Sequence, residues 1–216
     1  DSKGQMADGY EREDNHSPSK IAQIEGSWTD ISSGDVHSCG ILEDSEIYCW
    51  GGGEFGQIGD GIRSDRFIPT QVVIEGDKKF VSVKSGDFHN CALTSEGEVW
   101  CWGWNGYGQI GNGDFEDAFF PSRVDLGEGV IAKRIFTGPA HSCAIIETDY
   151  GYCWGSNTEN QISHGEDEGF EEPLRIFPDY KINEVGILTG NSISCIEKAD
   201  DELDCIGSMG SGWMGH

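Results

Sequence analysis

The chain has 216 residues, which is long enough to bury at least one sizeable hydrophobic core. Its 14 lysine and arginine residues against 39 aspartate and glutamate residues give a formal net charge of −25. This charge argues against nucleic acid or an anionic membrane as the main partner, because both attract basic proteins. No apolar run reaches the roughly 18 residues that a membrane-spanning helix needs.

The first 27 residues look like the end of a repeat. Gly4–Gly9 reads Gly-Gln-Met-Ala-Asp-Gly and matches Gly56–Gly61, which lies 52 residues later. We expect residues 1–27 to supply the last strand of a blade, near residues 20–24, and to place Ile21 and Ile24 at an interface. The Asn15 sequon is a candidate glycosylation site in an extracellular protein.

The eight cysteines form four pairs whose members lie ten residues apart, and successive pairs are offset by 52 residues. We expect the disulfides Cys39–Cys49, Cys91–Cys101, Cys143–Cys153 and Cys195–Cys205. Even pairing with no cysteine left over indicates an oxidising compartment. The spacing does not match zinc motifs, so no metal is expected, and nothing indicates a cofactor.

Each cysteine pair marks a hairpin, which can be worked out for the second copy. If Cys91 faces Cys101 in an antiparallel pair, Thr94 faces Glu98 and residues 95–97 form a three-residue loop. Glycine at the last loop position suits a left-handed backbone. Opposed cysteines in such a pair lie close enough to be bridged.

One strand precedes each hairpin, and another follows a proline after it. The leading strands are expected at Trp28–Ile31, Phe80–Val83, Ala132–Phe136 and Glu184–Leu188. The final strands are expected at Gln71–Ile74, Arg123–Leu126 and Leu174–Phe177. Four short strands in each of four 52-residue repeats predict an all-β protein, a β-propeller of four-stranded antiparallel blades with an internal disulfide in each. The blades are expected at residues 28–79, 80–131 and 132–183, with an incomplete fourth blade at 184–216.

The fourth copy stops before its last strand and differs most from the others. Its apolar residues near the incomplete edge extend the expected assembly interface to Ile206, Met209, Trp213 and Met214. Three arrangements remain open. The N-terminal strand could close a four-bladed ring, it could complete the blade of a neighbouring copy, or the chain could be an excerpt of a longer propeller.

The repeated motifs resemble a known family. Gly-x-x-His-(Ser/Asn)-Cys-Ala-Leu, Gly-x-Val-Trp-Cys-Trp-Gly and Gly-Gln-Ile-Gly recur in register across residues 4–215 and resemble the regulator of chromosome condensation repeat. The version with paired cysteines is similar to secreted and cell-surface members. The resemblance implies a β-propeller, most often seven-bladed. Members serve as exchange factors, inhibitors, receptors and scaffolds, so the fold alone does not fix the activity.

The histidines at positions 37, 89 and 141 are the obvious candidates for chemistry. Each recurs once per blade, whereas a catalytic centre is assembled once, so we expect structural hydrogen bonds, no catalytic residue and no enzyme activity. Trp104 and Tyr107 are candidate contacts for a glycan or a protein ligand, because exposed aromatic rings anchor both.

These observations predict a non-enzymatic extracellular interaction protein. In the first hypothesis it associates with itself head to tail by strand complementation and could build a filament. In the alternative it is a closed, monomeric propeller that binds a ligand, as a lectin or a receptor ectodomain does.

Overall fold

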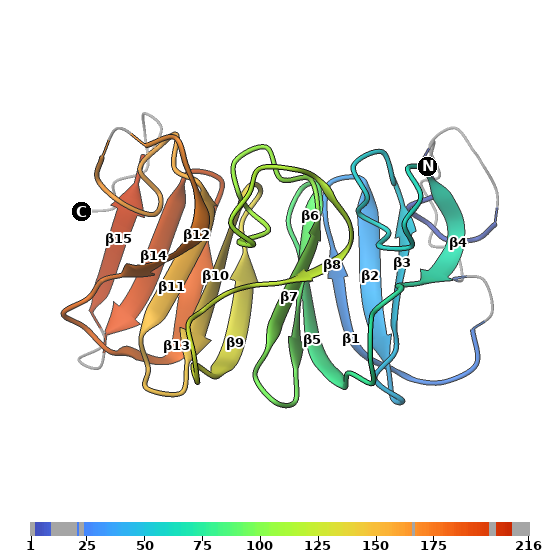
Figure 1. The fold of residues 1–216 in the computed structure, drawn as a ribbon, viewed down its shortest axis with the longest axis horizontal. Coiled ribbons are helices and arrows are strands. Elements are labelled where there is room, and N and C mark those ends of the chain that lie inside the picture. The colour runs from blue at the N-terminus through green and yellow to red at the C-terminus, as the bar shows by residue number, and fades with distance from the viewer. Residues whose placement is uncertain (1–2, 10–20, 22–23, 166, 199–201, 209–216) are drawn as a thin grey trace.

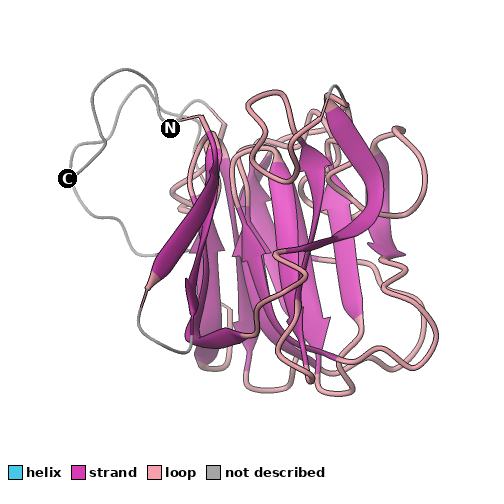
Figure 2. Cartoon of the chain, turned by 90° about the vertical axis from the view of Figure 1, so that its left-hand side faces the viewer, coloured by secondary structure: helices cyan, strands magenta, loops and turns pink. Residues whose placement is uncertain are grey.

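The structure is a computed structural model that describes residues 3–9, 21, 24–165, 167–198 and 202–208. In these residues the chain forms 15 strands. No helix is present among them, and Figure 2 shows only strands and loops. The strands make four antiparallel sheets, in which each strand pairs with its neighbour in sequence. The all-β propeller fold predicted from the repeats is therefore confirmed.

Each sheet is one blade, and the blades take the strands in chain order. Blade 1 contains β1 (Trp28–Ser33), β2 (His37–Leu42), β3 (Ile47–Gly51) and β4 (Arg66–Gln71). Blade 2 contains β5 (Phe80–Ser85), β6 (His89–Thr94), β7 (Val99–Gly103) and β8 (Ala118–Arg123). Blade 3 contains β9 (Ala132–Thr137), β10 (His141–Ile146), β11 (Gly151–Ser156) and β12 (Gly169–Ile176). Blade 4 has three strands in the described residues, β13 (Ile182–Thr189), β14 (Ile193–Lys198) and β15 (Leu203–Gly207).

The central hairpin of each blade has the predicted register. In blade 2, Cys91 faces Cys101 and Ala92 faces Trp100. The backbone N–H of Thr94 donates to Glu98 across a three-residue loop, and Gly97 takes the left-handed conformation with φ of 82°. All four expected disulfides are present, and each links two strands of one blade.

The predicted starts of the outer strands are wrong. β4 begins at Arg66 and β8 at Ala118, so Pro69 and Pro121 lie inside the strands rather than before them. The strand pairing shifts at this point, between Cys49 and Gly51 in blade 1. Proline is tolerated here because the outermost strand is a sheet edge and the bulge needs no N–H donor.

The hydrophobic core lies between the blades rather than within one of them. At the first junction, apolar side chains of blade 1 meet Phe80, Val83 and Trp102 of blade 2, all buried. Equivalent clusters fill the junctions of blades 2 with 3 and 3 with 4. The blades stand side by side in an open row, with blades 1 and 4 at opposite ends (Figure 1). A four-bladed ring closed within the described residues is therefore not the arrangement observed.

The N-terminal segment Gly4–Gly9 packs on blade 1 as its counterpart packs on blade 2. The Trp50 indole donates to the Gln5 carbonyl at 2.9 Å, and the Trp102 indole donates to the Gln57 carbonyl at the same distance. Gly9 N–H donates to Phe67 at 2.9 Å, just as Gly61 N–H donates to Phe119 at 3.0 Å. The two segments, which match in sequence at an offset of 52 residues, therefore also make the same contacts in the structure.

The other predictions about the two ends fall mostly outside the described residues. Ile21 and Ile24 belong to no strand, and the rest of the predicted strand at residues 20–24 lies outside the described part. The same holds for Asn15, Met209, Trp213 and Met214. The strand, the glycosylation site and these interface residues stay predictions.

Candidate functional site

The repeated histidines connect neighbouring blades. His37, His89 and His141 each open the second strand of a blade and are almost fully buried. The Nε2 atom of His37 lies 2.8 Å from Asn90 Oδ1, and that of His89 lies 2.8 Å from Ser142 Oγ. His141 makes the same contact with Ser194 at 3.1 Å. Each ring therefore ties its blade to the next.

Burial makes these rings poor acids and bases. Desolvation lowers the pKa of His89 to about 3, and the two neighbouring histidines add to the effect. Desolvation also lowers the pKa of His37 and of His141 to about 4. All three are neutral at pH 7 and are held inside the junctions, which fits the structural role predicted for them.

Trp104 and Tyr107 belong to a cluster of four half-buried rings across the first junction. Trp104 packs edge-on against Tyr107 and Phe88, with ring centroids 5.5 Å and 6.3 Å apart. Phe55, from the loop between β3 and β4, lies 5.7 Å from Phe88 and 6.3 Å from Trp104.

Sequence reasoning missed two of these four rings. Phe55 occupies in repeat 1 the position that Tyr107 occupies in repeat 2, so the 52-residue offset is the signal that would have found it. Phe88 has no such signal, because its place in the cluster depends on contacts with Phe55 and Trp104, which lie in the loops after β3 and β7. The rings pack mainly on one another, and contact of Trp104 and Tyr107 with a ligand stays a prediction.

The two ends of the row each expose half of a blade junction. Val83 is fully buried between blades 1 and 2, whereas Ile31, its counterpart in blade 1, is 51% exposed. At the other end, Leu203 in β15 is 60% exposed, whereas its counterparts Ile47 and Val99 are 1% exposed. We call the side of blade 1 that carries Trp28 and Ile31 the leading face. We call the side of blade 4 that carries Leu203 and the Cys195–Cys205 bridge the trailing face.

Ile206, which was expected at the assembly interface, is half-buried in β15. Its counterparts Trp102 and Trp154 face the preceding blade. Since side chains alternate along a strand, Ile206 lies on the opposite side of β15 from Leu203. The exposed apolar residues that sequence reasoning missed are Ile31 and Leu203. The 52-residue offset identifies their counterparts, but only the structure shows that the counterparts are buried.

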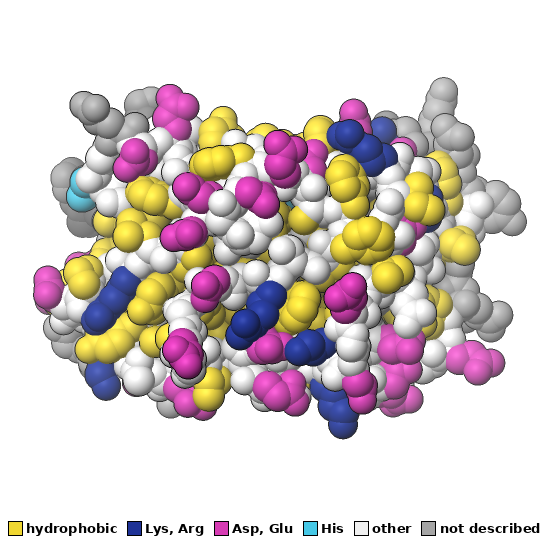
Figure 3. Space-filling view, viewed as in Figure 1, with side chains coloured by type: hydrophobic (Ala, Val, Ile, Leu, Met, Phe, Trp, Pro, Cys, Tyr) yellow, Lys and Arg dark blue, Asp and Glu magenta, His cyan; other side chains and the backbone are white. Residues whose placement is uncertain are grey.

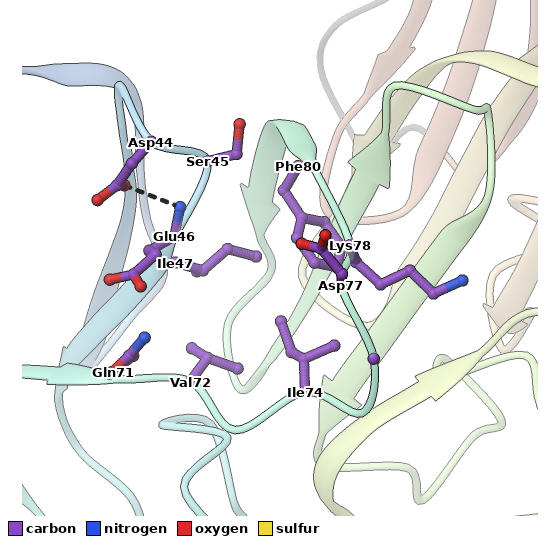
Figure 4. Close-up of a pocket in the computed structure, with 11 residues that line it drawn as sticks. Asp44, Ser45, Glu46, Ile47, Gln71, Val72, Ile74, Asp77, Lys78 and Phe80 are labelled. Carbon is purple, nitrogen blue, oxygen red and sulfur yellow. Dashed lines mark hydrogen bonds between the residues drawn. The ribbon is translucent and has the colours of Figure 1, made fainter.

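A cavity of about 230 Å³ opens at the junction of blades 1 and 2. The hairpin turn of blade 1 forms one wall and the linker after β4 forms the other (Figure 4). Acidic side chains are scattered over the face of the molecule in Figure 3, in keeping with the net charge.

The described residues contain no helix long and apolar enough to cross a membrane. In the same residues, no group of three or more histidine, cysteine, aspartate or glutamate side chains could hold a metal ion.

Comparison with known proteins places these features in a wider group. Two family models described as the regulator of chromosome condensation (RCC1) repeat match residues 28–57 and 80–109, and residues 44–93 and 96–145. The ultraviolet-B receptor UVR8 of Arabidopsis thaliana is 32% identical over 178 residues, which is 82% of this chain and 40% of that protein.

Solved structures share the fold at lower identity. Human WBSCR16 superposes with a TM-score of 0.77 at 20% identity, over 97% of this chain and 56% of that one. Yeast RCC1 (Prp20), solved in a complex with Kap60, superposes with a TM-score of 0.74 at 20% identity, over 86% of this chain and 45% of that one. The chain therefore spans about half the length of these relatives.

Proposed function

Because this chain belongs to the regulator of chromosome condensation (RCC1) repeat family, we propose that it is a non-enzymatic protein-interaction module that works outside the cell and associates with copies of itself. A role in binding is supported by yeast RCC1, which has Kap60 bound in its solved structure. The buried, neutral histidines of this chain offer no general acid or base at pH 7.

The proposed location follows from the cysteines. All eight are paired, and each pair links adjacent strands of one blade. Disulfides of this kind persist in oxidising compartments and are rare in the cytosol. They support secretion or display at a cell surface.

The observation that carries the proposed self-association is the exposure of Ile31 and Leu203. The counterparts of Ile31 are buried in the apolar cluster of every internal junction, and those of Leu203, Ile47 and Val99, are buried in the clusters of the first two junctions. The trailing face of blade 4 carries Leu203 and the Cys195–Cys205 bridge, at the positions where Ile47 and the Cys39–Cys49 bridge of blade 1 meet blade 2. Docking of blade 4 of one copy against blade 1 of another would bury both.

Such a contact joins two different surfaces, so it can repeat. A head-to-tail contact that does not close on itself builds a filament. Blade 4 also has three strands in the described residues, where its neighbours have four, and its last strand is an open edge. A strand from the N-terminal segment of the next copy could pair with that edge, as in other cases of strand addition.

Size-exclusion chromatography with light scattering tests the proposal. The 216-residue chain should elute as a concentration-dependent mixture above its monomer mass of 23.6 kDa. Ile31→Asp and Leu203→Asp should each give monomers, because a charge on either face disfavours burial of that face. Ile62→Asp is the matched control, since Ile62 is 55% exposed but lies in the loop between β3 and β4.

Mixing the two interface variants makes the test specific. The Ile31→Asp protein keeps its trailing face and the Leu203→Asp protein keeps its leading face, so the mixture should form one-to-one dimers and nothing larger. A symmetric contact would give no such rescue. A wild-type chain that stays monomeric at every concentration would overturn the proposal.

A further inference from the structure

The four disulfides differ in how far solvent reaches them. In blades 1 to 3 every cysteine is at most 1% exposed. In blade 4, Cys205 is exposed and Cys195 is half-buried. A reagent in solution therefore meets the bridge of blade 4 directly, whereas it meets the other three bridges only when a blade junction opens.

Packing at the junctions produces this difference. The Cys39–Cys49 bridge lies in the apolar cluster that joins blades 1 and 2, and the Sγ atom of Cys39 lies 3.3 Å from Asn90 Oδ1 of the next blade. The bridges of blades 2 and 3 lie in the two clusters that follow. The Cys195–Cys205 bridge is on the trailing face, at the end of the row in Figure 1, and no further blade covers it in the described part of the chain.

The strand that carries Cys205 is also the least supported central strand of the row. Among the described strands, β15 pairs with β14 alone, whereas its counterparts β3, β7 and β11 each lie between two strands. Neither Cys195 nor Cys205 belongs to the apolar cluster between blades 3 and 4. Opening their bridge would therefore loosen β15 without disturbing that junction.

Apolar side chains flank the bridge on the same face. Leu188 in β13 lies opposite Cys195 and is 54% exposed. Leu203, two residues before Cys205 in β15, is 60% exposed. Residues opposite each other in adjacent strands share a face of the sheet, and so do residues two apart in one strand. The bridge thus lies in an open apolar patch, where a polypeptide that carries a thiol can make contact beside the sulfur atoms.

We propose that the Cys195–Cys205 bridge is a site of thiol–disulfide exchange with a dithiol, and that docking of a second copy on the trailing face protects it. A thiolate of the dithiol attacks the sulfur of Cys205 and forms a mixed disulfide, and the sulfur of Cys195 leaves as a thiolate. The second thiol of the dithiol then displaces Cys205. Two electrons pass from the dithiol to the bridge, the dithiol becomes a disulfide, and its two protons pass to the two cysteines.

The two parts of this proposal have different foundations. The exchange site stands on the exposure of the bridge, whereas the protection rests on the proposed self-association. At internal junctions the following blade buries the equivalent bridge, so a docked leading face should bury this one. Since coupling between two events is reciprocal, opening the bridge should in turn weaken docking, which makes the assembly responsive to a reductant.

Limited reduction followed by alkylation tests the exchange site. The oxidised Ile31→Asp chain, which cannot dock on itself, is treated with dithiothreitol under native conditions, quenched with iodoacetamide at intervals and digested for mass spectrometry. Cys195 and Cys205 should be alkylated at least about tenfold faster than Cys143 and Cys153. The latter pair is the matched control, because it occupies the same hairpin positions one blade earlier and is buried.

Urea distinguishes direct access from local unfolding. Below the unfolding transition, urea should leave the rate at Cys195 and Cys205 nearly unchanged, because this bridge is reached in the folded chain. It should raise the rate at Cys143 and Cys153, because their bridge is reached only after opening. Equal rates at all four bridges, or rates that rise equally steeply with urea, would overturn the exchange site.

Mixing variants tests the protection. The Leu203→Asp protein keeps its leading face, so an excess of it should cover the trailing face of the Ile31→Asp protein. Alkylation of Cys205 in the Ile31→Asp copy, whose peptide is identified by its Leu203, should then slow by at least about threefold. Adding more of the Ile31→Asp protein instead should leave the rate unchanged.

Light scattering on the same mixtures separates this proposal from the proposed self-association. One-to-one dimers with no fall in the alkylation rate would overturn the protection and leave the self-association standing. Selective alkylation of blade 4 in mixtures that stay monomeric would support the exchange site, and would overturn the self-association together with the protection.

Discussion

Three buried histidines make the stability of the fold depend on pH. The pKa of His89 is about 3 in the folded chain and about 6.5 in an unfolded one. Below pH 6.5 the unfolded chain binds a proton that the folded chain refuses. The stabilisation is complete above pH 6.5 and is lost as the pH falls toward 3, at about 1.4 kcal/mol per pH unit.

We therefore expect His89→Gln to flatten the pH dependence by about one proton between pH 6 and pH 5. The measurement is the free energy of unfolding in urea at several pH values, compared with the wild type. His164→Gln, at an exposed loop position, serves as the control and should keep the wild-type slope. An unchanged slope for His89→Gln would show that this ring is protonated in the folded chain.

Repetition allowed the histidines to be interpreted as structural from the sequence, but it did not identify their partners. His37 bonds Asn90 and His89 bonds Ser142, each 53 positions along the chain. A sequence separation of 53 residues identifies the partner of each histidine only when neighbouring blades are known to pack in register. The exposure of Ile31 could not be predicted for the same reason, since its neighbours in sequence look like those of buried Val83.

At the scale of elements, each hairpin is held by one disulfide that closes a short loop. The Cys91–Cys101 bridge joins residues ten apart in the middle of blade 2. In the chain-entropy account, a loop of this size stabilises the fold by about 2–3 kcal/mol.

Replacing Cys91 and Cys101 together by serine should lower the free energy of unfolding by at least that amount, because both sulfur atoms are buried in the junction with blade 3. Urea unfolding followed by tryptophan fluorescence measures the loss. Serine at Cys195 and Cys205 is the comparison, and it should cost less because Cys205 is exposed on the trailing face. Equal losses would contradict the idea that burial adds to the loop effect.

The hairpins could be predicted because cysteine spacing, loop length and the turn glycine all specify one register. The starts of the outer strands could not be predicted, because a proline in the sequence usually indicates that no strand continues through it. Pro69 and Pro121 sit on sheet edges where the missing N–H costs nothing. The number of blades in the row follows from the repeats, whereas the lack of ring closure depends on how the blades are turned relative to one another.

At the scale of the whole molecule, two opposing effects act on the ends of the row. The exposed leading and trailing faces favour association, and a net charge of −25 opposes it. Salt weakens the repulsion, because the screening length falls from about 30 Å at 0.01 M to about 3 Å at 1 M. It has much less effect on the burial of apolar side chains such as Ile31 and Leu203.

Raising NaCl should therefore increase both the thermal midpoint of unfolding and the mass measured by light scattering. Because association stabilises the folded state by mass action, the midpoint should also rise with protein concentration at fixed salt. The Ile31→Asp protein separates the two effects: it should keep the response to salt, which comes from the charge of each chain, and lose the response to concentration. A midpoint that depends on salt but not on concentration in the wild type would mean that screening acts within single chains and that the two faces do not meet.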